Sequence, residues 1–192
     1  MYELVRNKDG SFAYKDLWDF TDGLDGGKPA GALVFDKAGN LYGTTEIGGK
    51  YDVGTVFKLA PTAQGQWKES VLHSFKGGTS DGQYAWGSLI FDAAGNLYGM
   101  TANGGIGCGA AVQRGLTVAK GCGTVFKLTP TSGGKWKETL LHHFAGGKDG
   151  SGPDGGSLVM DAVGNLYGTA VSGGRGACLN GGGCGVVFEI TP

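Results

Sequence analysis

Short apolar runs separated by Gly, Asn and Asp recur along the chain in a fixed order. In each recurring unit the first three runs are nearly continuous in apolar residues, as at residues 33–36, 40–45 and 55–59. Strands that are covered on both faces have this composition. The fourth run, residues 67–75, mixes Lys, Glu, Ser and His with its apolar residues, which is typical of an edge strand. The pattern predicts a four-stranded antiparallel unit with its most polar strand outermost.

This unit is repeated about three times. Copies of the first strand begin at Gly31, Gly87 and Gly156, so successive copies lie 56 and 69 residues apart. Residues 1–20 match only the third and fourth strands, and the last copy stops after its third strand. We therefore predict a single repeat domain over residues 1–192. It consists of a partial blade at 1–20 and repeats at 31–75, 87–144 and 156–190.

Sheets of this kind, stacked face to face, are typical of a β-propeller. We predict an all-β fold, a β-propeller built from four-stranded antiparallel blades, with thirteen strands or about 3.25 blades in this chain. Because a propeller needs at least about four blades, a second chain or a missing segment of a longer chain would have to complete the ring. A β-solenoid is the structural alternative, but its coils are shorter than these repeats.

Three sequence words recur in the units: Gly-Asn-Leu-Tyr-Gly-Thr-Thr, Gly-Gly and Gly-Thr-Val-Phe-Lys-Leu. They closely resemble the GloVer (Gloeo/Verruco) tandem repeat, and the resemblance covers nearly the whole chain. It implies a propeller-like fold and an exported or surface-attached bacterial protein. It implies no established reaction, so the function has to be argued from the residues.

Composition and charge exclude several classes of function. Of 192 residues 41 are Gly, which excludes a helical protein and indicates many tight turns. Charged residues make up 17% and the formal net charge is -1, so no basic stripe is present to bind nucleic acid. No run approaches the roughly 18 apolar residues of a membrane span. The first residues lack the basic and apolar regions of a signal peptide, so we expect any such leader to lie outside this chain.

The four cysteines flank the loops between the second and third strands of two repeats. Because each pair is present in one repeat and absent as a pair from the first, we predict local disulfides, Cys108 to Cys122 and Cys178 to Cys184. Disulfides indicate an oxidising compartment. The alternative is a four-Cys zinc site joining two loops, but neither pair has the short CxxC spacing of such sites.

The loops that join one unit to the next, and those between the second and third strands, should emerge together. This loop-rich face contains the irregular and variable segments, so it is the expected binding face. Its aromatic and basic side chains are the predicted ligand-binding residues: Tyr84, Trp86, Tyr51 and Arg114. Aromatic platforms beside carboxylates suit carbohydrate, whose C–H face stacks on a ring while its hydroxyls bind oxygen acceptors. Ordinary turn chemistry and packing between blades remain the alternative roles.

No nucleophile or zinc-protease motif is present, so a binding or scaffolding module that recognises carbohydrate or another cell-surface partner is favoured over an enzyme. The enzyme alternative is a glycoside hydrolase or lyase that uses loop carboxylates, for which the candidates are Asp81, Asp149, Asp154 and Asp25. A structural repeat that assembles with itself is the third hypothesis. We predict no cofactor; Ca²⁺ is the alternative for the acidic loops, although no Asp-x-Asp-x-Asp-Gly run supports it.

Overall fold

The computed structural model describes residues 1–108, 110–113, 116–119, 121–153, 155–176, 178 and 183–191. Over these residues the chain is all-β, with antiparallel strand pairs and only two short 3-10 turns, Ser132–Gly134 and Gly147–Asp149. No helix in the described part of the chain is long and apolar enough to cross a membrane.

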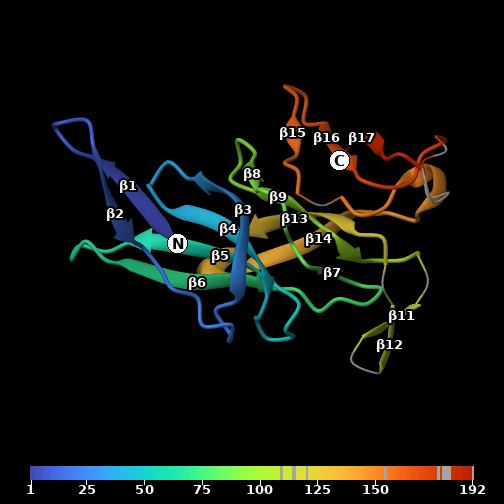
Figure 1. Cartoon of the computed structure of the whole chain (residues 1–192), viewed down its shortest axis with the longest axis horizontal. Coiled ribbons are helices and arrows are strands. Elements are labelled where there is room, and N and C mark those ends of the chain that lie inside the picture. The colour runs from blue at the N-terminus through green and yellow to red at the C-terminus, as the bar shows by residue number, and fades with distance from the viewer. Residues whose placement is uncertain are drawn as a thin grey trace.

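The repeats fold as the predicted antiparallel units, and within each sheet the strands lie side by side in chain order (Figure 1). The first sheet consists of β3 (Gly27–Phe35), β4 (Leu41–Ile47), β5 (Thr55–Pro61) and β6 (Trp67–Ser74). The second consists of β8 (Ile90–Phe91), β9 (Leu97–Thr101), β13 (Thr124–Pro130) and β14 (Trp136–His143). The third consists of β15 (Val159–Met160), β16 (Leu166–Ala170) and β17 (Val186–Ile190), and β1 (Tyr2–Arg6) pairs with β2 (Phe12–Asp16) as a hairpin. The closed ring of a propeller stays a prediction.

Four strands of the described chain lie outside the thirteen predicted from the repeat. β7 (Gly82–Gln83) pairs with β10 (Asn103–Gly104), and β11 (Ala110–Gln113) pairs with β12 (Leu116–Ala119). β7 lies in the loop that leads into the second repeat, and the other three lie in the loop between its second and third strands. Two-residue pairings depend on loops meeting in space, so the hydrophobic pattern along the chain does not indicate them.

The turn between the first and second strands is held by an Asp in every repeat. Asp36 Oδ1 accepts hydrogen bonds from the backbone N–H groups of Ala38 and Asn40, both at 2.9 Å. Its Oδ2 accepts from the Asn40 side chain at 2.6 Å and from the Tyr42 hydroxyl at 3.0 Å. Burial opposes ionisation of Asp36, but these hydrogen bonds outweigh it and lower its pKa. Asp92 and Asp161 make the same bonds, so these residues are turn caps, as their position predicts.

The second Gly of the Gly-Asn-Leu-Tyr-Gly word makes room for the core. A Cβ on Gly43 would lie 2.6 Å from Cζ of Phe57 and 2.8 Å from Cδ2 of Leu33. These two side chains come from the strands on either side. Gly99 and Gly168 face the corresponding Phe and Leu of their own repeats. Glycine in the middle strand therefore lets two large side chains meet above it.

The middle sheet is buried on both faces. Leu97, Phe126 and Leu128 pack in one core with side chains of the first sheet. Tyr98 and Val125 point the other way and pack in a second core with the third sheet. A third core lies between the first sheet and the N-terminal segment. Covering on both faces explains why these strands read as nearly continuous apolar runs.

The same aromatic contact joins each unit to the next. The Phe that follows the fourth strand packs edge to face on the Phe in the third strand of the following unit, with ring centroids 4.9 to 5.2 Å apart. The pairs are Phe20 with Phe57, Phe75 with Phe126, and Phe144 with Phe188. The three pairs show that successive units pack on one another in the same way.

The repeats approach one another closely near their first strands. Ser88 forms a parallel bridge with Ser157, and its N–H donates to the carbonyl of Gly156 at 3.3 Å. The N–H of Ala32 donates to Ser88 Oγ at 2.8 Å. A Cβ on Gly31 would lie 2.7 Å from the backbone of Gly87, so the approach is close. The sheets thus converge along their first strands.

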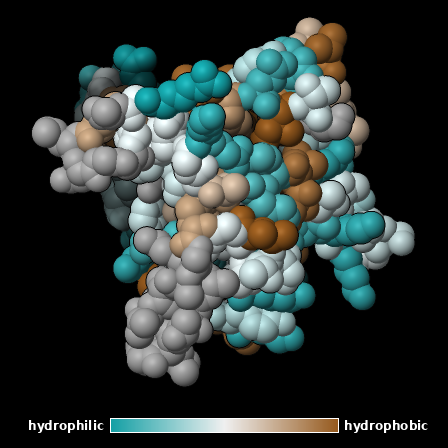
Figure 2. Space-filling view, turned by 90° about the vertical axis from the view of Figure 1, so that its right-hand side faces the viewer, coloured by the Kyte–Doolittle hydropathy of each residue, from teal (hydrophilic) through white to brown (hydrophobic). Residues whose placement is uncertain are grey.

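Apolar side chains lie exposed at both ends of the stack of sheets. On the third sheet Val159 is 64% exposed and Val187 is 81% exposed. Figure 2 views the molecule from this side, and brown hydrophobic atoms lie among polar ones on it. At the other end, the β1–β2 hairpin exposes large apolar side chains: Tyr2, Leu4, Val5, Phe12 and Tyr14.

Candidate functional site

The two kinds of loop that were expected to share a face lie together in every repeat. The loop between units bonds the loop between the second and third strands: Gly27 pairs with Ile47, Gln83 with Asn103, and Ser151 with Ser172. We call this side of the molecule the loop face. Backbone pairing fixes each inter-unit loop against its own sheet.

Asp81, one of the four candidate catalytic carboxylates, is only 2% exposed. Its carboxylate accepts hydrogen bonds from the backbone N–H groups of Lys76 at 2.8 Å and Gly82 at 2.6 Å. His73 Nε2 lies 3.2 Å from its Oδ2. Burial raises the pKa of Asp81, but His73 and the backbone donors outweigh burial and lower it. Asp81 thus fixes the inter-unit loop and does not present its carboxylate on the loop face.

Asp25 and Asp149 occupy the position of Asp81 in the loops before the first and third repeats. Asp149 accepts from the N–H of Ala145 at 2.7 Å, and its Oδ1 lies 3.1 Å from His142 Nε2. Asp25 accepts from the N–H of Thr21 at 3.0 Å and from its hydroxyl at 2.6 Å. Both carboxylates are partly exposed. Each of them shapes its loop by the same kind of bond that Asp81 makes.

The remaining loop-face candidates are not gathered into one described site. Arg114 and Asp154 lie outside the described residues. Tyr51 is 41% exposed and has the Nζ of its neighbour Lys50 5.2 Å from its ring centroid. Tyr84 and Trp86 are half-buried. None of these aromatic residues lines the cavity described below.

The cysteines form the two predicted disulfides. Cys108 pairs with Cys122, with Cα atoms 5.4 Å apart, and Cys178 pairs with Cys184, with Cα atoms 5.3 Å apart. No cysteine among the described residues is free. The four-Cys zinc alternative is therefore wrong, because all four sulfurs are already bonded. Both pairs belong to loops of the loop face.

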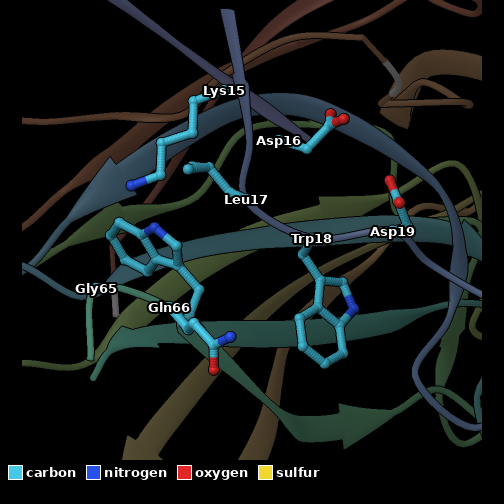
Figure 3. A pocket seen from close by; sticks show the side chains of 8 residues that line it. Lys15, Asp16, Leu17, Trp18, Asp19, Gly65 and Gln66 are labelled. Atoms are coloured by element: carbon cyan, nitrogen blue, oxygen red, sulfur yellow. The ribbon is translucent and has the colours of Figure 1, made fainter. Parts of the chain in front are cut away.

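A cavity of about 520 Å³ lies between the N-terminal hairpin unit and the first sheet (Figure 3). Residues from the end of β2 and from the β5–β6 turn line it: Lys15, Asp16, Leu17, Trp18, Asp19, Gly65, Gln66 and Trp67. Its volume lies within the roughly 300–1,000 Å³ of small-molecule sites. This cavity is the candidate binding site, and sequence reasoning did not select its residues.

Two indole rings and several exposed polar groups share this cavity. Trp18 and Trp67 are half-buried, so part of each ring faces the cavity. Asp16 and Asp19 supply exposed acceptors, while Lys15 supplies an exposed donor. Gln66, also exposed, can donate and accept. The cavity therefore combines flat apolar surface with hydrogen-bonding groups of both kinds.

The repeat explains why the two tryptophans meet. Trp67 begins β6, the fourth strand of the first sheet. Trp18 follows β2, the fourth strand of the preceding partial unit, and packs on the core of the first sheet together with Trp67. In the later repeats His73 and His142 occupy the position of Trp18. Among the described units, only the first junction therefore has an indole at both of these positions.

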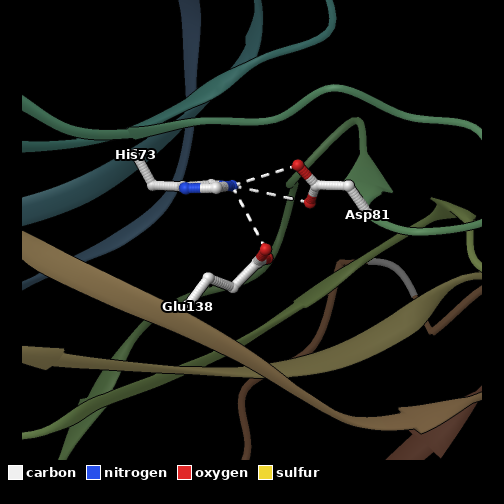
Figure 4. Close-up of side chains that lie close together, drawn as sticks. All are labelled: His73, Asp81 and Glu138. Atoms are coloured by element: carbon white, nitrogen blue, oxygen red, sulfur yellow. Dashed lines mark hydrogen bonds and ion pairs between the residues drawn. The ribbon is translucent and has the colours of Figure 1, made fainter.

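A second cluster lies between the first and second sheets (Figure 4). His73 comes from β6, Asp81 from the inter-unit loop and Glu138 from β14. His73 Nε2 lies 3.2 Å from Asp81 Oδ2 and 3.5 Å from Glu138 Oε2. Burial, and then the charge of Asp81, raise the pKa of Glu138 to about 8. In the figure all three side chains point toward a common centre.

Glu69 is the counterpart of Glu138 in the preceding unit. Burial, and then the charge of Asp25, raise its pKa to about 7. Trp18 stands there in place of a histidine, so the earlier junction has the Glu and the Asp without an imidazole. Trp18 Nε1 and Glu69 Oε1 are both buried without a hydrogen-bond partner among the described residues.

One signal in the sequence could have indicated these glutamates. Residues alternate between partly buried and exposed at the start of the fourth strands, and Glu69 shares its face with Trp67 and Val71. Strict alternation places such a carboxylate on the packed side of the sheet. The side chains that face each Glu belong to another unit. How far one sheet is shifted against the next cannot be deduced from the repeated sequence.

Residues 4–115 match the sequence model of the Gloeobacter/Verrucomicrobia repeat, which confirms the resemblance carried by the recurring words. A search of curated proteins found no significant match to this chain.

Proposed function

Since the chain belongs to the family of Gloeobacter/Verrucomicrobia repeat proteins, we propose that it is an extracellular binding module that holds carbohydrate in the Trp18–Trp67 cavity. The observation that carries this proposal is the pairing of two indoles with exposed carboxylate, amide and ammonium groups in one cavity. The loop face, favoured by the sequence, is a weaker choice because Asp81 is buried and already bonded.

Carbohydrate suits this cavity for a chemical reason. A sugar ring has C–H faces that pack on an indole and hydroxyls that need donors and acceptors around its rim. Trp18 and Trp67 provide the first, and Asp16, Asp19 and Gln66 provide the second. An entirely apolar ligand would leave these polar groups without partners, which disfavours it.

The units form part of a β-propeller in this proposal. Two observations support it: the repeats lie close together near their first strands, with a parallel bridge between Ser88 and Ser157, and one aromatic contact recurs between successive sheets. Wedge-like sheets that converge on one side can be arranged around an axis. The apolar faces left exposed at both ends of the stack would then be covered by a second copy of the chain, which makes the assembly a homo-oligomer.

Export agrees with the cysteine chemistry. Cys108–Cys122 and Cys178–Cys184 are both paired, and disulfides persist in oxidising surroundings. We therefore place the protein outside the cell or on its surface, where glycans are abundant ligands.

Glycan-array screening followed by calorimetric titration of the bound sugar tests the binding site. Trp18→Ala removes one stacking surface and should weaken binding at least about tenfold, which corresponds to about 1.4 kcal/mol. Gln66→Ala removes a rim contact and should weaken binding less.

Lys135→Ala is the matched control for Gln66→Ala, because Lys135 occupies the same position of the next repeat and does not line the cavity. It should bind sugar like the wild type. Loss of binding in Tyr51→Ala with full binding in Trp18→Ala would move the site to the loop face. Release of reducing ends from a bound glycan would replace the binding module by an enzyme.

A further inference from the structure

We infer that His73, Asp81 and Glu138 form a site for one divalent transition-metal ion, with Zn²⁺ as the best-matched ion, between the first and second sheets. The site goes beyond the carbohydrate cavity and shares no residue with it. Its ligands come from two consecutive repeats, so a bound ion would cross-link the two sheets.

The spacing of the three donor atoms fits such an ion. The ligand atoms all lie within 4.8 Å of one another, and Nε2 of His73 is 3.2 and 3.5 Å from the two carboxylates. Around tetrahedral Zn²⁺, bonds of about 2.0–2.1 Å place two ligand atoms about 3.4 Å apart. An ion between the three side chains therefore needs only small movements of them.

The site holds more acceptors than donors. Two carboxylates face one imidazole, and Glu138 Oε1 is buried without a hydrogen-bond partner among the described residues. The side chains of Asp81, Glu138 and His73 are 3%, 14% and 16% exposed. The ammonium group of Lys76 attracts the Glu138 carboxylate, but Lys76 is an exposed residue of the loop. Buried carboxylates need a compensating positive charge, which a metal ion would supply.

The donor set selects the kind of metal. Ca²⁺ and Mg²⁺ prefer ligand sets made of oxygen alone, whereas imidazole with carboxylate suits zinc and its neighbours. Three protein ligands leave a fourth position open on the ion. Asp81 is already oriented by the N–H groups of Lys76 and Gly82, as ligating carboxylates commonly are.

Other junctions of the same chain lack one member of the set. His142 and Asp149 form the same pair as His73 and Asp81, but no third ligand joins them among the described residues. Glu69 lies near Asp25, but Trp18 replaces the histidine. We therefore expect one ion per chain, and these junctions offer internal controls.

Calorimetric titration of untagged, EDTA-treated protein with ZnCl₂ at about pH 8 tests the site, since metal binding releases protons from its ligands. The wild type should bind one Zn²⁺ per chain. His73→Gln and Glu138→Gln should each weaken binding by more than about 100-fold, because loss of a ligand costs at least as much as loss of an outer-shell partner. His142→Gln and Glu69→Gln should bind like the wild type.

Absence of zinc binding by the folded wild type would overturn the proposal. Zinc affinity equal to that of the wild type in both His73→Gln and Glu138→Gln would overturn it as well. Near-ultraviolet circular dichroism checks that each variant is folded. Should a variant not fold, Co²⁺ added to the wild type decides the matter. Visible absorption typical of cobalt with an imidazole and carboxylates supports the site, and a spectrum of aqueous cobalt overturns it.

Discussion

At the scale of single residues, the most unusual feature is a pair of glutamates buried between sheets. Glu69 and Glu138 occupy the same place in successive fourth strands, and each lies near an Asp of the preceding inter-unit loop. Burial raises both pKa values, to about 7 and about 8 respectively. In the metal-free protein, a proton is therefore the simplest way to neutralise each of them.

This predicts stability that falls as the pH rises. The folded state holds protons on Glu69 and Glu138 that the unfolded chain, with pKa near 4.5, has already released. The free energy of unfolding should therefore be highest below about pH 4.5 for these two groups, and this contribution should be lost as pH rises to about 8. Urea denaturation in EDTA buffer across this range measures the slope.

Glu138→Gln should reduce the slope from about pH 4.5 to about pH 8, since Gln keeps the neutral form at every pH. Glu69→Gln should reduce it only between about pH 4.5 and about pH 7. Glu3→Gln, at an exposed position of β1, is the control and should leave the slope unchanged. Identical slopes in the wild type and in the double Glu variant would disprove this assignment.

The sequence revealed residue roles that depend on one repeat and missed those that depend on two. Asp36 caps its own turn and Cys108 pairs within its own loop, so both could be predicted from local spacing. Trp18 and Trp67 pack on one core, and His73 meets Glu138, across junctions of units. Their meeting depends on how far one sheet is shifted against the next, which no short-range pattern encodes.

At the scale of strands and sheets, the packing of each unit depends on a glycine beneath two large side chains. In the second repeat a Cβ on Gly99 would lie 2.5 Å from Cζ of Phe126 and 2.8 Å from Cδ2 of Leu89. Phe126 is fully buried and belongs to the aromatic joint with the first unit. The strands can therefore hold their register only while this position stays small.

Gly99→Ala should destabilise the protein by about 1–3 kcal/mol through overpacking. Phe126→Leu shortens the obstructing side chain, so the double variant should be more stable than the sum of the two single effects implies. A double-mutant cycle by urea denaturation measures this coupling. Strict additivity would mean that Gly99 and Phe126 do not compete for the same space.

All thirteen strands predicted from the repeat are present, because their apolar runs and turn residues act locally. β7 and β10 were missed, since two-residue pairings arise only where two loops lie together. The β11–β12 hairpin was missed because it belongs to the long loop of the second repeat, where the repeated pattern is interrupted.

At the scale of the whole molecule, the outer faces of the stack expose apolar side chains. The outward side of the third sheet exposes Val159 and Val187, at the positions where the second sheet is covered by its neighbour. The N-terminal hairpin exposes apolar residues at the other end. Two such surfaces on one protein favour association with another copy.

Light scattering after size-exclusion chromatography should therefore give twice the chain mass of 19.6 kDa. Val187→Lys places a charge on the exposed face of the third sheet and should return the mass to that of one chain. Val163→Lys is the control, because Val163 is 83% exposed in the turn between β15 and β16 and lies outside the sheet face. A folded wild type with the mass of one chain would contradict association.

The edge-to-face ring contact between units has a consequence for how repeat number changes in evolution. Every complete unit carries both halves of the joint, one Phe in its third strand and one after its fourth. A duplicated gene segment that encodes one unit would therefore supply both Phe rings of the contact. Its insertion would create the same interface that the existing units already form. The number of units can therefore change by whole copies, because each new copy makes the same contact with its neighbours.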